Sequence, residues 1–67
     1  MAKIQLNGKK ITIKQKVYLS NLLDLYKLDK KKVAIELNGV IVPKQFYKKK
    51  LLKNNDIIEV VHFIGGG

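Results

Sequence analysis

Two Asn-Gly dipeptides constrain the fold of this chain most tightly, and the first of them is Asn7-Gly8. Asn-Gly is the preferred pair for a two-residue type I′ turn, which joins two antiparallel strands into a hairpin. Apolar and polar residues alternate on both sides of the pair, so that Ile4 should lie opposite Ile11. Four apolar side chains would then share one face that another element must cover, namely Ile4, Leu6, Ile11 and Ile13.

A helix that could cover this face is predicted shortly after the hairpin. Leu25 widens an apolar stripe whose members recur at i, i+3, i+4 and i+7, namely Leu19, Leu22, Leu23 and Tyr26. Tyr18 stands where a capping side chain is usual, so the start of this helix is weakly marked. A shorter helical turn is expected within residues 45–52, with Phe46 and one leucine in the core.

The second pair, Asn38-Gly39, predicts a second and shorter hairpin. Its first strand runs from Val33 to Leu37, and its second runs from Val40 to Val42 and is stopped by Pro43. The turn pair again separates two apolar segments, as in the first hairpin.

The last apolar segment, Ile57 to Ile64, predicts a strand that leads directly into the final glycines. Glu59 sets its register, because a glutamate that faces solvent places Ile58 and Val60 toward the core. The order of elements predicts an α+β fold in which one main helix packs across a mixed sheet of four to five strands. The first and last strands should be central neighbours in this sheet.

The composition limits the chemistry that such a domain can perform. A chain of 67 residues has little room for an enclosed active site. It contains no Cys, which excludes disulfides, thiolate metal sites and cysteine nucleophiles. His62 is the only histidine, and Asp56 is more simply explained as a turn residue whose carboxylate binds backbone. We therefore expect that the chain is not an enzyme.

The charge is strongly positive, with 14 basic residues, all of them lysine, against 5 acidic ones and a net charge of +9. Arginine supplies the planar fork that recognises guanine, so a surface of lysines alone favours solvated side chains over specific binding of nucleic acid. The first residues contain no apolar run of the kind found in signal sequences, and no segment is long enough to span a membrane. We expect a cytoplasmic protein.

Three glycines, Gly65-Gly66-Gly67, follow the last predicted strand without a spacer. They bury no side chain and lose much entropy on ordering, so a frayed end is the plain alternative to a function. A backbone without Cβ atoms can enter a narrow channel and present its carboxylate to a reagent there. The sequence is therefore divided into a domain, residues 1–64, and a glycine tail, residues 65–67, which is expected to be flexible.

Several segments resemble the ThiS-type sulfur carriers of thiamin biosynthesis, which are small β-grasp proteins of the ubiquitin-like superfamily. The similarity is most specific at the end of the chain, over residues 55–67, and it includes Leu22-Leu23 and the segment from Leu37 to Pro43. Asn55 departs from the family pattern, in which Gly is usual, and so does Tyr18, where Thr is usual. Neither departure affects the final glycines.

The resemblance implies a relay that uses the C-terminal carboxylate. An adenylating enzyme of the ubiquitin-activating type would use ATP and Mg to convert the Gly67 carboxylate into an acyl adenylate. Gly65 and Gly66 would form the thin neck through which Gly67 reaches the reagent. Sulfur from a cysteine-derived persulfide would then displace AMP and leave a thiocarboxylate, which thiazole synthase consumes. The carrier itself would bind no cofactor and catalyse nothing.

A docking surface beside the tail is expected from the register of the last strand. Val61 and Phe63 would face solvent there, and Ile64 follows them, so these apolar residues are predicted to contact the partner.

Other functions remain open from the sequence. The small subunit of molybdopterin synthase has the same fold and the same terminal chemistry, although such chains are usually longer. A protein modifier would transfer the same adenylate to lysines of other proteins. A basic nucleic-acid-binding module is indicated by the charge alone.

Overall fold

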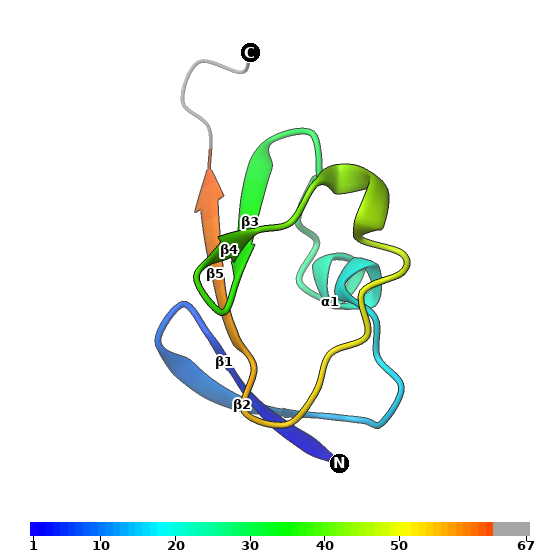
Figure 1. The fold of residues 1–67 in the computed structure, drawn as a ribbon, viewed down its shortest axis with the longest axis vertical. Coiled ribbons are helices and arrows are strands. Elements are labelled where there is room, and N and C mark those ends of the chain that lie inside the picture. Colours follow the sequence, from blue (N-terminus) through cyan, green and yellow to red (C-terminus); the bar gives the residue numbers. More distant parts are fainter. Residues whose placement is uncertain (63–67) are drawn as a thin grey trace.

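A mixed sheet with one α-helix packed against one face makes up the fold in the computed structural model, which describes residues 1–62 (Figure 1). The strands occur in the order β2-β1-β5-β3-β4 within one five-stranded sheet. The elements in chain order are β1 (Ala2–Leu6), β2 (Lys9–Ile13), α1 (Leu19–Leu25), β3 (Val33–Leu37), β4 (Val40–Ile41), the 3₁₀ helix η1 (Lys44–Phe46) and β5 (Ile57–His62). The predicted α+β architecture is confirmed.

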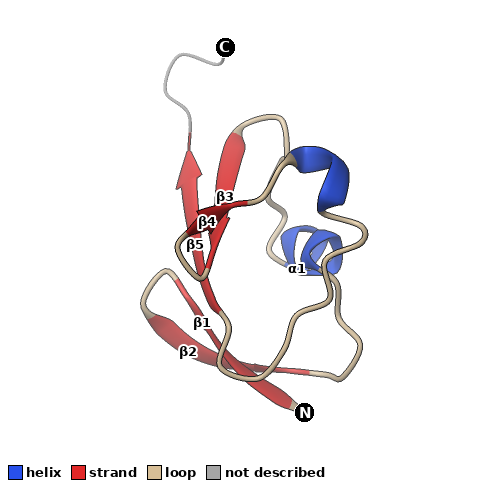
Figure 2. Ribbon diagram, viewed as in Figure 1, coloured by secondary structure: helices blue, strands red, loops and turns tan. Residues whose placement is uncertain are grey.

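Both Asn-Gly pairs form the expected turns. Asn7 and Gly8 have φ angles of 49° and 84°, and Asn38 and Gly39 have angles of 53° and 84°, as a type I′ turn requires. Ile4 lies opposite Ile11 in the β1–β2 hairpin, as predicted. The helices all lie on one side of the sheet (Figure 2). The opposite side, which we call the outer face, is not covered by any element within residues 1–62.

The core lies between the sheet and the helices. Its central side chains, all at most 1% exposed, are Leu19, Leu22, Val33, Ile35 and Ile58. These residues come from α1, β3 and β5, so the helix stripe and the two central apolar strands meet as expected. Burial of such side chains contributes about 1.5 to 3 kcal/mol each relative to exposure.

The prediction that Leu25 and Tyr26 belong to the buried helix stripe is wrong, because α1 is only seven residues long. Leu25 is 71% exposed, and its side chain lies about 110° away from the centre of the stripe around the helix axis. Tyr26 is the C-cap and is 43% exposed. The helix ends in a Schellman motif, in which Lys27 has a φ of 55° and the N–H of Leu28 donates to the carbonyl of Leu23. Leu28 then packs against the core in place of Tyr26.

The start of α1 is stabilised by the backbone of a distant loop. The N–H groups of Leu19 and Ser20 donate to the carbonyls of Lys50 and Tyr47, at 2.8 and 2.9 Å. In addition, Asn21 Oδ1 accepts a hydrogen bond from the N–H of Tyr18. These bonds satisfy groups that a capping side chain normally satisfies, which explains the weak cap in the sequence.

The prediction that Phe46 enters the core is also wrong. Phe46 is 44% exposed, whereas the neighbouring Tyr47 is 2% exposed and packs beneath η1. A 3₁₀ turn rotates successive side chains by about 120°, so a shift of one residue exchanges the buried position for the exposed one. Of the two leucines that follow, Leu52 is buried and Leu51 is exposed, as the expectation of one buried leucine requires.

Candidate functional site

The site predicted from the sequence depends on β5, because the final glycines follow this strand by sequence. β5 lies in the middle of the sheet, where it pairs in parallel with β1 and antiparallel with β3 (Figure 1). The predicted adjacency of the first and last strands is confirmed. β1 pairs with the first two residues of β5, and β3 pairs with it from Ile58 to His62, so β5 is held in the sheet over its whole length.

The register of β5 is the one predicted from Glu59. Ile58 is fully buried and Val60 is half-buried against the core. The outward side chains are those of Ile57, Glu59 and Val61, and Val61 is 52% exposed. Val61 is therefore available on the outer face, opposite Ala34 of β3.

The other predicted site residues lie outside residues 1–62, which the structure describes. They are Phe63, Ile64, Gly65, Gly66 and Gly67. The predicted boundary between a domain of residues 1–64 and a tail of residues 65–67 also lies there. Their roles stay predictions.

Two asparagine side chains extend the hydrogen bonding of β5 beyond the ends of its neighbours. Asn7 Oδ1 accepts from the N–H of Val60 at 2.7 Å, just past the end of β1. Asn38 Oδ1 accepts from the N–H of Ile57 at 2.8 Å, just past the end of β3. The sequence predicts both residues only as turn formers. The available signal was the choice of Asn in both turns, since Gly offers the same φ without a side-chain acceptor.

Asp56 has the structural role expected for a turn residue. It is 6% exposed, and its carboxylate accepts hydrogen bonds from the N–H of Lys53 at 2.7 Å and from Asn38 Nδ2 at 3.0 Å. These bonds join the turn before β5 to the turn after β3. The carboxylate is thus engaged with its own fold, which leaves it poorly placed for acid-base chemistry.

His62 is the last described residue of β5 and is exposed, opposite Val33 in the register. Within residues 1–62, no three residues among His, Asp and Glu come close enough together to hold a metal ion. No helix in this part of the chain is long and apolar enough to cross a bilayer.

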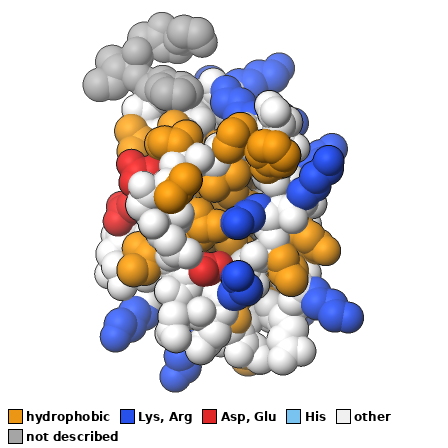
Figure 3. Space-filling model, in the orientation of Figure 1, with side chains coloured by type: hydrophobic (Ala, Val, Ile, Leu, Met, Phe, Trp, Pro, Cys, Tyr) orange, Lys and Arg blue, Asp and Glu red, His pale blue; other side chains and the backbone are white. Residues whose placement is uncertain are grey.

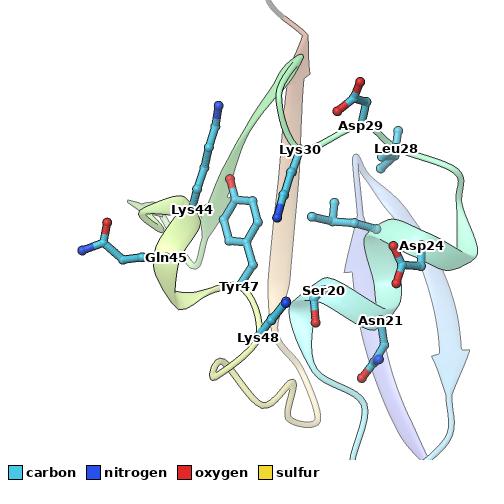
Figure 4. A pocket seen from close by; sticks show the side chains of 11 residues that line it. Ser20, Asn21, Asp24, Leu28, Asp29, Lys30, Lys44, Gln45, Tyr47 and Lys48 are labelled. Atoms are coloured by element: carbon cyan, nitrogen blue, oxygen red, sulfur yellow. The ribbon is translucent and has the colours of Figure 1, made fainter.

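A hollow lies on the helix side of the molecule, away from the outer face. This cavity of about 750 Å³ is formed between α1, the loop after it and η1, and Figure 4 shows the side chains that line it. Lys30 and Lys48 extend into it from opposite sides, and the ring of Tyr47 forms part of its wall (Figure 4). Burial raises the pKa of Tyr47, and a backbone hydrogen bond with Ile35 partly offsets this effect. Val61, the predicted site residue within residues 1–62, does not line this cavity.

The sequence model of the ThiS family matches residues 3–67, which is nearly the whole chain. The chain belongs to the ThiS family. It is 42% identical to the sulfur carrier protein ThiS of Bacillus subtilis, over 96% of this chain and 98% of that protein. The resemblance stated from the sequence is confirmed.

Solved structures and longer proteins extend the ThiS comparison. The crystal structure of the thiamine biosynthesis protein ThiS from Geobacter metallireducens has a TM-score of 0.83 and 28% identity, covering 97% of this chain and 99% of that one. The β-grasp fold is therefore confirmed. A thiazole synthase of Magnetococcus marinus is 42% identical over 97% of this chain, which corresponds to only 20% of that enzyme.

Proposed function

We propose that this ThiS-family chain is a sulfur carrier of thiamin biosynthesis that holds sulfur as a thiocarboxylate on Gly67. The observation that supports this most directly is the family match, which extends to residue 67 and thus includes the terminal glycines. The absence of Cys in the sequence agrees with it, because no side chain can carry a persulfide. The terminal carboxylate is then the group on which sulfur would be held.

The chemistry requires a partner enzyme that supplies ATP and Mg, since the carrier contributes only its carboxylate. The Gly67 carboxylate attacks the α-phosphorus of ATP, releasing pyrophosphate and forming an acyl adenylate. The terminal sulfur of a cysteine-derived persulfide then attacks the acyl carbon and expels AMP. A thiol of the transfer machinery finally cleaves the resulting S–S bond, so that the thiocarboxylate is released and a disulfide forms. In these reaction steps the carrier is a substrate and binds no cofactor of its own.

Docking on the adenylating enzyme is assigned to the apolar residues before the glycines. Val61 is exposed on the outer face, and Phe63 and Ile64 come next in the sequence. An exposed apolar group beside the reacting end gives binding energy without entering the catalytic channel. Gly65 and Gly66 would cross the channel, where a Cβ would collide with the walls.

Thiazole synthase is proposed as the enzyme that consumes the thiocarboxylate. Two proteins named thiazole synthase, from Paramagnetospirillum magneticum and Magnetococcus marinus, contain a segment similar to this chain at 37% and 42% identity. Covalent linkage of a carrier to its consumer raises their effective concentration, which supports a direct encounter between the two. This observation also favours thiazole formation over molybdopterin synthesis.

Intact mass spectrometry tests the proposal. The chain is incubated with ATP, Mg, its adenylating enzyme and a persulfide donor, and the mass should rise by the difference between one sulfur and one oxygen. The same chain without Gly67 should not change in mass. Bacillus subtilis ThiS serves as the control that the enzyme and donor are active.

The loaded carrier can then be offered to possible acceptor proteins, and the acceptor that reacts separates the alternative functions. Transfer of sulfur to the large molybdopterin synthase subunit, but not to thiazole synthase, would favour the molybdopterin pathway. Covalent adducts on lysines of other proteins would indicate a protein modifier. No mass change while the control carrier is loaded would contradict the proposal.

A further inference from the structure

The outer face carries two glutamates directly opposite each other. Glu36 of β3 is in register with Glu59 of β5, and Ile41 of β4 lies opposite Glu36 on the other side. We call Glu36 and Glu59 the acidic pair. Two like charges at facing positions of an antiparallel pair repel each other and destabilise the sheet. The fold therefore gains nothing from this pairing.

Lysines of the chain do not compensate the acidic pair. Neither carboxylate takes part in an ion pair within residues 1–62, although the chain contains 14 lysines. Glu59 is exposed and Glu36 is half-buried. The acidic pair is thus a negative site without a direct ionic partner within residues 1–62, on a strongly positive protein.

Exposed apolar side chains surround the acidic pair. Ile41, Ile57 and Val61 are 58%, 44% and 52% exposed and lie on the same face. Along β5, Val61 is two residues after Glu59, and Ile57 is two residues before it. Exposed apolar side chains of this kind contribute binding energy when a partner covers them, whereas charges at the centre of an interface are uncommon and need a partner of opposite charge.

The charges of the whole chain are divided between the outer face and the rest of the surface. Lys3 and Lys10 also point to the outer face, but they lie on β1 and β2 and form no ion pair with Glu36 or Glu59, so they offset the acidic pair only in the formal charge of this face. The other twelve lysines and three aspartates account for the full net charge of +9. In Figure 3 the acidic side chains appear chiefly along the left edge, on the side of the sheet, and lysines are spread over the remaining surface.

We propose that the outer face of β3, β4 and β5 binds an apolar surface of the adenylating partner that has a basic side chain at its centre, placed between Glu36 and Glu59. This inference rests on the proposed function and specifies the chemistry of its docking surface. Burying two carboxylates without a positive charge would cost more than the apolar contacts return. One arginine fork is well suited to the task, since it can bond to two carboxylates at once.

A second copy of this chain is a poor occupant of the same face. In a symmetric dimer, the acidic pair of one copy would lie against the outer face of the other, which carries the same pair. If the twofold axis passes near the acidic pair, four carboxylates meet without a positive charge between them, because Lys3 and Lys10 lie on β1 and β2. A partner of opposite charge at the centre avoids this cost.

The test compares the thermal stability and the partner affinity of the same variants. Glu36→Gln, Glu59→Gln and Glu59→Lys are made in the full chain, with Asp24→Asn as the matched control, because Asp24 is an exposed carboxylate on α1. Removing the repulsion should raise Tm by about 1 to 5 °C in the Glu variants. Calorimetric titration with the adenylating enzyme should show affinity about tenfold weaker for Glu→Gln and weaker still for Glu59→Lys. Asp24→Asn should change neither quantity.

Greater stability together with weaker binding is the result that a purely structural role would not produce. Affinities of the Glu variants within twofold of the Asp24→Asn affinity would overturn the inference, and so would a lower Tm for Glu→Gln. Concentration-dependent dimers of the wild-type chain that dissociate in Val61→Asp would also overturn it in favour of a second copy.

Mass spectrometry separates failure of this inference from failure of the proposed function. If the wild-type chain gains sulfur at Gly67 while the Glu variants bind as the control does, only the docking chemistry is wrong. If the wild-type chain is never loaded, the sulfur-carrier proposal and this inference fail together.

Discussion

Asn7 Oδ1 accepts a hydrogen bond of 2.7 Å from the backbone N–H of Val60, 53 residues further along the chain. The bond joins the first turn of the protein to the strand that precedes the glycine tail. The backbone N–H of Asn7 in turn donates to the carbonyl of Ile58 at 2.9 Å, so that one turn residue bonds β5 twice. The β1–β2 turn therefore helps to fix the position of β5, in addition to reversing the chain.

Replacing Asn7 by Gly should remove the side-chain bond to Val60 while keeping the positive φ that the turn needs. Asn55 offers a matched control, because its φ is 72° and no side-chain hydrogen bond is found for it within residues 1–62. Both Asn→Gly changes relieve the same backbone restriction, and only the first loses a bond. Asn7→Gly should be less stable than Asn55→Gly by about 1 kcal/mol in urea unfolding.

Amide hydrogen exchange gives an independent readout of the Asn7 bond. The N–H of Val60 should exchange faster in Asn7→Gly than in the wild-type chain, whereas Asn7→Asp, which retains an acceptor, should protect it. Equal stability of the two Gly variants, with unchanged exchange at Val60, would show that the bond contributes nothing.

Asn55→Gly should itself stabilise the fold. A non-glycine residue with a φ of 72° is strained, and glycine adopts this conformation without a steric cost. The expected gain in the free energy of unfolding is about 0.5 to 1 kcal/mol, measured by urea unfolding at neutral pH. A loss of stability would mean that the Asn55 side chain has a role that its contacts do not reveal.

Local signals in the sequence were sufficient to predict the hairpins and the register of β5. An Asn-Gly pair determines its own turn, and alternation then fixes which side chains share a face, as Ile4 and Ile11 do. The same locality explains why Val61 was correctly expected to be exposed. No contact with a distant segment was needed for these predictions.

Features that depend on distant segments could not be predicted in this way. The start of α1 is bonded to the carbonyls of Lys50 and Tyr47, which lie far away in sequence. Tyr47 is buried in place of Phe46 because of the direction in which the η1 turn points each side chain, and not because of side-chain hydrophobicity. The bond from Asn7 to Val60 likewise exists only after β5 has entered the sheet.

Tyr47 should make stability depend on pH at the alkaline end. Burial raises its pKa in the folded state, so folding favours the neutral phenol over the phenolate. This contribution is complete below pH about 10 and is lost as the pH rises through the folded-state pKa. The difference in unfolding free energy between the wild-type chain and Tyr47→Phe should therefore decrease above pH about 10.

The comparison with Tyr47→Phe isolates the tyrosine, because both proteins carry the same 14 lysines and differ only in the phenol hydroxyl of residue 47. Urea unfolding of both proteins across the alkaline range provides the measurement. A difference that stays constant with pH would contradict the assigned shift.

Val61→Asp should weaken binding to the adenylating enzyme while leaving the fold intact. Val61 is 52% exposed, so an aspartate there remains hydrated in the free protein but would be buried in a complex. The affinity should fall by about tenfold or more, as calorimetric titration can measure. Phe63→Asp is expected to act in the same way.

Leu25→Asp is the matched control for Val61→Asp, since Leu25 is 71% exposed on α1 and the change in charge is identical. Both variants should unfold in a single transition close to that of the wild-type chain. Equal loss of affinity in the two variants would point to a general effect of charge and would remove Val61 from the docking surface.

Gly66→Val should slow the loading of sulfur without weakening docking. If Gly66 crosses a narrow channel on the way to the reacting carboxylate, a branched side chain would collide with the channel walls and displace Gly67 from the α-phosphorus of ATP. The outer face would still supply the binding energy, so KM should change little while kcat falls by about tenfold or more. Gly66→Ala should give an intermediate rate, because its side chain is a single methyl group. The formation of thiocarboxylate followed by intact mass over time measures these rates, and a Val variant loaded at the wild-type rate would show that the glycines are not needed for access.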